Sequence, residues 1–189
     1  MDKSKRYSRN EMKKKAQKIE LLLLDVDGVM TDGGIYFAGE ELEMKKFNTQ
    51  DGLGIVMARR AGIETGIITG RVSDAVARRA DELNIDKIYQ GQHWKIEAIT
   101  EILADYKSDQ LAYMGDDLLD LPVLGRVGFP IAPANARPAV KKNVLYVTDT
   151  PGGEGAIREA VDYLLELRGD LNELVEFYID SGDYNQSEL

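Results

Sequence analysis

The stretch Leu21-Leu22-Leu23-Leu24-Asp25-Val26-Asp27-Gly28-Val29 decides the fold class of this sequence. Consecutive leucines that end at an Asp-Gly signal are typical of a short buried strand, which we expect over residues 19–26. Asp25 and Asp27 are two residues apart, and in an extended segment their carboxylates project to the same side. Gly28 permits the tight backbone that must follow such a pair.

Downstream of this strand, short apolar runs alternate with longer amphipathic stretches. This alternation predicts an α/β fold built from βαβ units, with a mainly parallel sheet and helices on both faces. Further strands are expected at 64–69, 86–89, 110–114, 127–131 and 144–147. Helices are expected at 51–61, 73–83, 94–106, 136–141, 154–167 and 170–179. A hairpin of residues 35–37 and 44–47 is expected after the first strand.

Composition favours a single soluble domain. The chain has 189 residues, of which 43% are hydrophobic, and its formal charge of −9 argues against a general nucleic-acid binder. Cysteine is absent and there is one histidine, which excludes disulfides and argues against a zinc site. The longest apolar run, Leu21 to Leu24, is too short to span a membrane. We therefore expect a cytoplasmic protein.

The charge distribution suggests three parts of the chain. Residues 1–18 carry eight Lys or Arg against Asp2 and Glu11, and form a basic arm or helix. Residues 19–168 form the α/β domain, and residues 169–189 a C-terminal tail whose last polar stretch we expect to be loose. The basic arm could contact an anionic partner, but a solvated helix is the interpretation that we favour.

Polar residues follow the ends of several predicted strands. They are Asp25, Asp27, Thr69, Asp116, Asp117 and Asp120. In open α/β sheets, ligands bind outside the carboxyl ends of the strands, and these residues should converge there. Two carboxylates ~4 Å apart repel by about 4 kcal/mol at an effective dielectric near 20, and such a cluster needs a compensating cation. Oxygen ligands favour Mg²⁺.

These residue types fit phosphoryl transfer. Asp25 could attack phosphorus while Asp27 gives a proton to the leaving oxygen and later activates water. Thr69 and Gly70 offer a hydroxyl and a backbone N–H to phosphoryl oxygens, and Lys95 offers a cation at the start of its helix. Each feature alone would be interpreted as a turn, a cap or a surface charge. Their joint occurrence at strand ends favours the catalytic interpretation.

Four motifs resemble those of the haloacid dehalogenase superfamily. They are residues 25–33 (DVDGVMTDG), residues 68–71 (ITGR), Lys95 and residues 115–120 (GDDLLD). The resemblance implies a Rossmann-like fold, with Asp25 as nucleophile and Asp27 as general acid and base. It also implies that Asp25, the backbone carbonyl of Asp27 and Asp116 bind Mg²⁺. Asp117 and Asp120 would orient these groups without binding the metal, and Asp120 would do so through Lys95.

Finer motifs resemble one family within that superfamily. Residues 31–36, 46–55, 89–91 and 152–159 are similar to 3-deoxy-D-manno-octulosonate 8-phosphate phosphatases. These enzymes hydrolyse a phosphorylated eight-carbon keto-sugar acid on the way to lipopolysaccharide. The resemblance implies a hairpin insert, no cap domain and a homotetramer in which neighbouring subunits close the site. The glycine-rich segment at 152–155 would reach an adjacent subunit.

Three alternatives remain at this point. Phosphatases of a nine-carbon keto-sugar acid 9-phosphate share nearly all these motifs. Arg71 favours the eight-carbon substrate, because the nine-carbon enzymes carry an acidic residue there and an arginine can pair bidentately with the substrate carboxylate. At position 154, between the glycines, this chain has Glu154, whereas many eight-carbon enzymes have an arginine. A receiver-like signalling domain lacks the acid/base at Asp27, and the complete motif set argues against a non-catalytic oligomerisation module.

Overall fold

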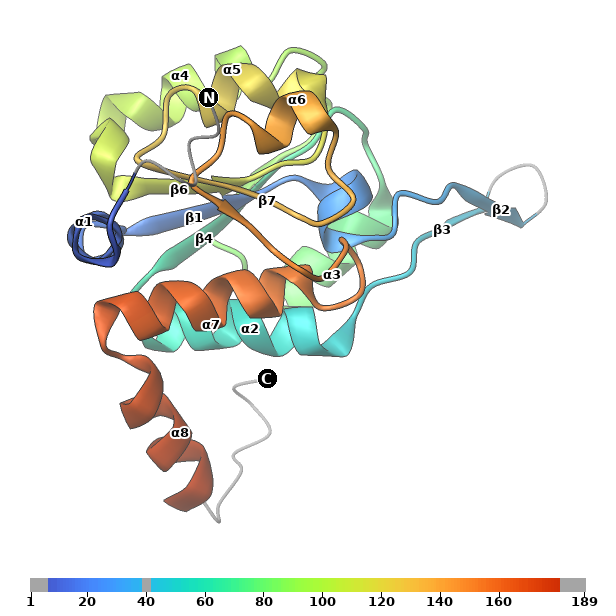
Figure 1. Cartoon of the computed structure of the whole chain (residues 1–189). Coiled ribbons are helices and arrows are strands. Elements are labelled where there is room, and N and C mark those ends of the chain that lie inside the picture. The colour runs from blue at the N-terminus through green and yellow to red at the C-terminus, as the bar shows by residue number, and fades with distance from the viewer. Residues whose placement is uncertain (1–6, 39–41, 181–189) are drawn as a thin grey trace.

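The centre of the protein is one six-stranded sheet, seen in a computed structural model that describes residues 7–38 and 42–180 (Figure 1). The strand order is β5-β4-β1-β6-β7-β8, and every neighbouring pair is parallel. The strands are β1 (Leu21–Leu24), β4 (Glu64–Ile68), β5 (Lys87–Tyr89), β6 (Leu111–Met114), β7 (Phe129–Ala132) and β8 (Tyr146–Val147). A central parallel strand is covered on both faces, which explains the unbroken leucines of β1.

Helices cover both faces of the sheet, as Figure 1 shows. On one face lie α2 (Thr49–Arg60), α3 (Asp74–Glu82) and α7 (Ala156–Arg168), with α1 (Arg9–Ala16) and α8 (Leu171–Asp180) packed against α7. On the other lie α4 (Ile96–Asp105), α5 (Leu121–Leu124) and α6 (Pro138–Lys141). Single 3₁₀ turns occur at Ser108–Gln110 and Leu118–Asp120. Alternate leucines of β1 enter the two cores: Leu22 and Leu24 one, Leu21 and Leu23 the other. The predicted α/β architecture is confirmed.

The hairpin insert projects from the end of the sheet at which β1 ends (Figure 1). It pairs β2 (Tyr36–Ala38) with β3 (Leu42–Met44), and residues 39–41 between them lie outside the described part of the chain. The predicted second strand at 44–47 was wrong, because the alternation that defines the strand lies earlier, in Leu42-Glu43-Met44. Phe47 forms an isolated bridge with Thr31. The described residues between β1 and α2 form no cap domain.

The first and the last of the described helices, α1 and α8, pack on this core. Helix α1 buries Met12 and Ala16, and Arg9 forms an ion pair of 2.6 Å with Glu166 of α7. Helix α8 buries Leu174. Within the described residues, no helix combines the length and the apolar character needed to cross a bilayer. The expected looseness of 181–189 concerns residues outside those that the structure describes.

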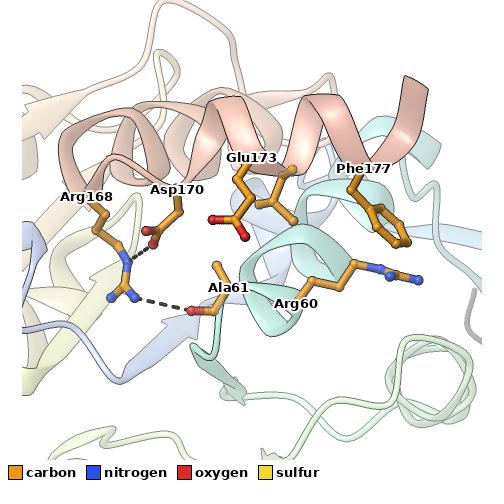
Figure 2. Close-up of a pocket in the computed structure, with 7 residues that line it drawn as sticks. Arg60, Ala61, Arg168, Asp170, Glu173 and Phe177 are labelled. Carbon is orange, nitrogen blue, oxygen red and sulfur yellow. Dashed lines mark hydrogen bonds and ion pairs between the residues drawn. The ribbon is translucent and has the colours of Figure 1, made fainter. Parts of the chain in front are cut away.

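Figure 2 shows how α8 is joined to the body of the protein. Figure 2 marks the hydrogen bond, of 3.2 Å, that Arg168 donates to the Ala61 carbonyl oxygen. Arg168 also donates to the Ile19 carbonyl oxygen at 2.8 Å. The Arg60 guanidinium lies 4.6 Å from the centre of the Phe177 ring, a favourable cation–π distance. Arg60, Arg168 and Phe177 help to line a pocket between α8 and the body of the protein. Because Arg168 bonds to Ile19, which precedes β1, this pocket lies towards the amino ends of the strands, opposite the edge where ligands of such sheets bind.

Candidate active site

A cleft of about 440 Å³ lies at the carboxyl ends of the central strands. Its lining includes all nine residues that the sequence singled out: Asp25, Asp27, Thr69, Gly70, Arg71, Lys95, Asp116, Asp117 and Asp120. They come from the loops after β1, β4 and β6 and from the start of α4. The expected convergence of these segments is therefore observed, which makes the cleft the candidate active site.

The loop after β1 presents the first aspartates to this cleft. The Asp25 amide donates to the Met114 carbonyl of β6 at 3.0 Å, which fixes the end of the strand. Gly28 has φ 86°, and a Cβ atom there would lie 2.3 Å from Oδ2 of Asp116. Both the conformation and the space therefore require glycine. Gly28 therefore lets the loop after β1 pass directly against Asp116, which follows β6.

Lys95 forms ion pairs with two of the aspartates that line the cleft. Its Nζ lies 2.7 Å from Oδ1 of Asp25 and 2.6 Å from Oδ1 of Asp120, and its side chain is 4% exposed. Burial alone would lower the pKa of Lys95, but these two carboxylates raise it above its ordinary value. Lys95 therefore stays charged. Burial and Asp120 raise the pKa of Tyr113, whose neutral hydroxyl lies 2.5 Å from Oδ1 of Asp120 and donates to it.

Asp120 is fully engaged in holding its neighbours. Its Oδ1 accepts from Lys95 and Tyr113, and its Oδ2 accepts from the amides of Asp116 and Asp117 at 2.8 Å and 3.0 Å. The Asp117 carboxylate caps the Leu118 amide at 2.7 Å. Asp120 therefore holds the backbone at Asp116 and Asp117, whereas the exposed Asp117 carboxylate is bonded within its own turn.

The carboxylates form a cation site by their chemistry. Oxygens of Asp25, Asp116 and Asp120 lie within 4.8 Å of one another. Burial and then Asp120 raise the pKa of Asp25 to about 7, against the opposing effect of Lys95. Burial, Asp120 and Asp117 raise that of Asp116 to about 7. The positive charge of Lys95 does not balance these anions, and both oxygens of Asp120 are engaged by the protein. Asp25 and Asp116 are therefore the carboxylates that could hold a hard cation such as Mg²⁺.

Magnesium should stabilise the protein in a pH-dependent way. A folded-state pKa near 7 instead of 3.8 means that Asp25 and Asp116 contribute stability below about pH 4, which is lost as the pH rises through about 7. Thermal unfolding in EDTA should therefore show a falling Tm between pH 5 and 8, and Mg²⁺ should raise Tm more at pH 8 than at pH 5. The Asp116→Asn variant should lose most of this magnesium effect. An equal shift at both pH values would contradict this origin.

The glycine-rich segment at 152–155 packs against the loop after β1 of its own chain, a contact that the sequence did not predict. The Gly152 amide donates to Oδ1 of Asn135 at 2.7 Å, and Nδ2 of Asn135 donates to the Gly28 carbonyl at 3.0 Å. The Gly153 amide donates to the Val29 carbonyl at 3.0 Å. Glu154 is exposed and does not line the cleft of its own chain.

A side chain at position 152 should disrupt this contact. A Cβ atom there would lie 1.9 Å from the Gly28 carbonyl oxygen, and the loop after β1 would have to move. We expect Gly152→Ala to lower the free energy of unfolding by about 1–3 kcal/mol and phosphatase turnover by about 100-fold. Gly125→Ala is the control, because Gly125 has φ −74° and its nearest contact is 3.3 Å away. Equal activities of the two variants would show that the contact is dispensable.

Two charged residues of the hairpin contact side chains that line the cleft, and the sequence alone did not predict a role for them. Nζ of Lys45 lies 2.5 Å from Oδ1 of Asp27. Glu43 accepts from Nη2 of Arg71 at 2.6 Å, while the Arg71 side chain remains 43% exposed. Thr69 is buried, and a Cβ atom at Gly70 would lie at van der Waals distance from the backbone of Gln92 and His93, at 3.7 Å and 3.9 Å. The other residues were predicted because they follow apolar strands of the main sheet. Neither Lys45 nor Glu43 follows such a strand, and no pattern in the sequence therefore indicated them.

Residues 84–160 match the haloacid dehalogenase-like hydrolase family. The 3-deoxy-D-manno-octulosonate 8-phosphate phosphatase of Escherichia coli strain K12 is 45% identical over 161 residues, which cover 84% of this chain and 86% of that enzyme. This chain belongs to the 3-deoxy-D-manno-octulosonate 8-phosphate phosphatase family. Membership confirms the resemblance found in the four motifs.

Solved structures of the 3-deoxy-D-manno-octulosonate 8-phosphate phosphatase family share the fold. The enzyme from Moraxella catarrhalis, in complex with a magnesium ion, a phosphate ion and a KDO molecule, has a TM-score of 0.86 and 37% identity, covering 89% of this chain and 98% of that one. The cobalt-bound enzyme from Haemophilus influenzae has a TM-score of 0.80 and 34% identity, covering 91% and 97%. The Rossmann-like fold of the haloacid dehalogenase superfamily is thereby confirmed.

Proposed function

We propose that this protein is a Mg²⁺-dependent phosphomonoester hydrolase that removes phosphate from 3-deoxy-D-manno-octulosonate 8-phosphate. One observation carries the proposal: all nine residues expected for this chemistry line one cleft, in a chain 45% identical to the Escherichia coli enzyme over most of its length. The magnesium, phosphate and KDO held by the Moraxella catarrhalis relative are the ligand classes that such a cleft would accept.

Asp25 is the nucleophile of the first step. Its Oδ1 is held by Lys95 and by the Val26 amide, at 2.7 Å each, which leaves Oδ2 for attack on phosphorus. The bond from phosphorus to the leaving sugar oxygen breaks, and Asp27 donates a proton to that oxygen. The product of this step is an aspartyl phosphate at Asp25.

Asp27 then acts as the base of the second step. It takes a proton from water, whose oxygen attacks phosphorus and releases inorganic phosphate and free Asp25. Thr69 and the Gly70 amide bind phosphoryl oxygens in both steps, and Lys95 offsets their charge. Asp25, Asp116 and the Asp27 backbone carbonyl would hold Mg²⁺, whose positive charge would offset the repulsion between an anionic nucleophile and an anionic phosphate.

Arg71 is the residue that we assign to the substrate carboxylate. Its guanidinium is half-exposed at the edge of the cleft and has a fork geometry that matches a carboxylate. An arginine at this place favours a keto-sugar acid over a neutral sugar phosphate.

The oligomer that we propose is a homotetramer formed through the hairpins. Without a cap domain, the cleft is open to water, and its closure needs another surface. The hairpin exposes large apolar side chains, and so does the rim of the cleft. They are Ile35, Tyr36, Phe37 and Met44 on the hairpin, Leu119 in the lining of the cleft, and Val72, Trp94 and Leu118, which are sequence neighbours of lining residues. Patches of this kind mark protein interfaces.

The domain roles and the location complete the proposal. Residues 19–168 carry the catalysis, while the basic segment 1–18 and the tail 169–189 are appendages. We propose a cytoplasmic enzyme of lipopolysaccharide synthesis that acts on neither nucleic acid nor membranes. The net charge of −9 supports the exclusion of nucleic acid.

A phosphate-release assay tests this function. The purified protein, with 3-deoxy-D-manno-octulosonate 8-phosphate and Mg²⁺, should release inorganic phosphate, and EDTA should abolish the release. Added Mg²⁺ should then restore it. Absence of release in the presence of Mg²⁺ would refute the assignment of the substrate.

A further inference from the structure

The returning strand of the hairpin brings a buried cation to the proposed acid/base. Lys45 comes directly after β3, and its Nζ lies 2.5 Å from Oδ1 of Asp27. The Lys45 side chain is only 1% exposed, although the neighbouring Met44 and Lys46 side chains point to solvent. Figure 1 shows the hairpin leaving the body of the protein beside the loop that follows β1.

Lys45 belongs to a closed circuit of four charges. Oε1 of Glu43 lies 3.8 Å from Nζ of Lys45 and 2.6 Å from Nη2 of Arg71. Nε of Arg71 lies 4.0 Å from Oδ2 of Asp27. Burial would raise the pKa of Glu43, but its hydrogen bonds to Arg71 and Ser73 and the charges of Lys45 and Arg71 lower it overall. The charges of two anions and two cations therefore offset one another, and they come from three segments: the hairpin, the loop after β1 and the loop after β4.

This circuit gives the two oxygens of Asp27 different surroundings. Oδ1 is taken by Lys45, whereas Oδ2 is 4.0 Å from the half-exposed Arg71. A general acid must be held within hydrogen-bond reach of the oxygen that it protonates. Asp27 lies in an irregular loop, and within residues 7–38 and 42–180 Lys45 is the donor that holds its carboxylate. A carboxylate held at one oxygen keeps the other directed to one place.

We propose that Lys45 is a positioning residue of the reaction, which fixes Oδ1 of Asp27 so that Oδ2 faces the leaving oxygen of the substrate. The proposal rests on the proposed phosphatase function. It gives the hairpin of each chain a part in the active site of the same chain. A merely structural Lys45 would anchor the hairpin and would affect all substrates alike.

The leaving group distinguishes the two roles. The alkoxide of a sugar phosphate needs a proton in order to leave, whereas the nitrophenolate of p-nitrophenyl phosphate does not. Since kcat/KM reports the steps up to release of the leaving group, Lys45→Met should lower it about 100-fold for the sugar phosphate and less than about 10-fold for p-nitrophenyl phosphate. Lys46→Met is the matched control, because Lys46 is 55% exposed. It should change both values less than about twofold.

An equal fall of kcat/KM for the two substrates, or no fall for either, would overturn the proposal. Circular dichroism and the Mg²⁺-induced rise in Tm report whether the variant is folded with its metal site intact. If Lys45→Met does not fold, the neutral variant Lys45→Gln is measured, and the same ratio of the two substrates decides. If the wild-type protein cleaves p-nitrophenyl phosphate but not the keto-sugar acid phosphate, the proposed substrate fails, and a simple alkyl phosphate replaces it in the test of Lys45.

Discussion

Asp25→Asn will lower phosphate release by at least about 10⁴-fold while leaving the protein folded. The asparagine side chain has the same shape, but it lacks the anionic oxygen that attacks phosphorus. Lys95 and the Val26 amide, which hold Oδ1 of Asp25 at 2.7 Å, can still bond an amide oxygen. The site would therefore keep its geometry and lose its nucleophile.

Three quantities are measured for this variant: its turnover, its Tm, and the mass of the acid-quenched protein, which shows any bound phosphoryl group. Burial already raises the pKa of Asp25 to about 7, so a neutral side chain should keep or increase Tm in EDTA at pH 8. Wild-type enzyme quenched in acid during turnover should carry one phosphoryl group on Asp25, and the variant none. Asp109→Asn, at the surface ion pair with Lys18, serves as the control and should retain full activity. Turnover of Asp25→Asn within tenfold of the wild type would remove Asp25 from the mechanism.

Lys95→Met should be the most destabilising substitution in the cleft. The ammonium of Lys95 lies between Asp25 and Asp120 with a side chain 4% exposed, and its removal leaves two buried carboxylates facing each other. Breaking a buried pair in this way costs about 3–5 kcal/mol of unfolding free energy. Turnover should also fall, by roughly 10³-fold, because the cation that offsets the phosphoryl charge is lost.

The pH dependence separates this effect from lost packing. The destabilisation of Lys95→Met should be larger at pH 8 than at pH 5, because the carboxylates that it leaves unpaired take up protons as the pH falls. Denaturant unfolding of the magnesium-free protein at the two pH values measures it. Lys18→Met removes a lysine from an exposed ion pair, and its free energy of unfolding should be close to that of the wild type. If Lys95→Met is as stable as Lys18→Met, the ion pairs of Lys95 with Asp25 and Asp120 do not stabilise the fold.

The residues that could be predicted share one property: they follow strands of the main sheet. Asp25, Thr69 and Asp116 each come directly after, or within two residues of, a strand whose apolar run is visible in the sequence. Because parallel strands end at one edge, their order along the chain does not matter for convergence. Lys95 was found through its motif and its place at the start of a helix, where the structure has it.

The residues that could not be predicted are joined by long-range contacts with no periodic signal. Asn135 bonds to Gly28 across 107 positions of the chain, and a lone asparagine in a loop carries no sign of that partner. Tyr113 was assigned correctly to a strand, but its hydroxyl role depends on Asp120 and Lys95 beneath it. Lys45 was placed in a strand that ends earlier, and its direction depends on the path of the chain after Met44.

Phosphate release measured in parallel on the eight-carbon 8-phosphate and the nine-carbon 9-phosphate keto-sugar acids tests the assignment of the function most directly. Both substrates carry a carboxylate and a primary phosphate, and they differ in chain length. With Mg²⁺ present, we predict that kcat/KM for 3-deoxy-D-manno-octulosonate 8-phosphate exceeds that for the nine-carbon compound by at least about tenfold, which corresponds to about 1.4 kcal/mol of transition-state binding. A clear preference for the nine-carbon phosphate would contradict the assignment.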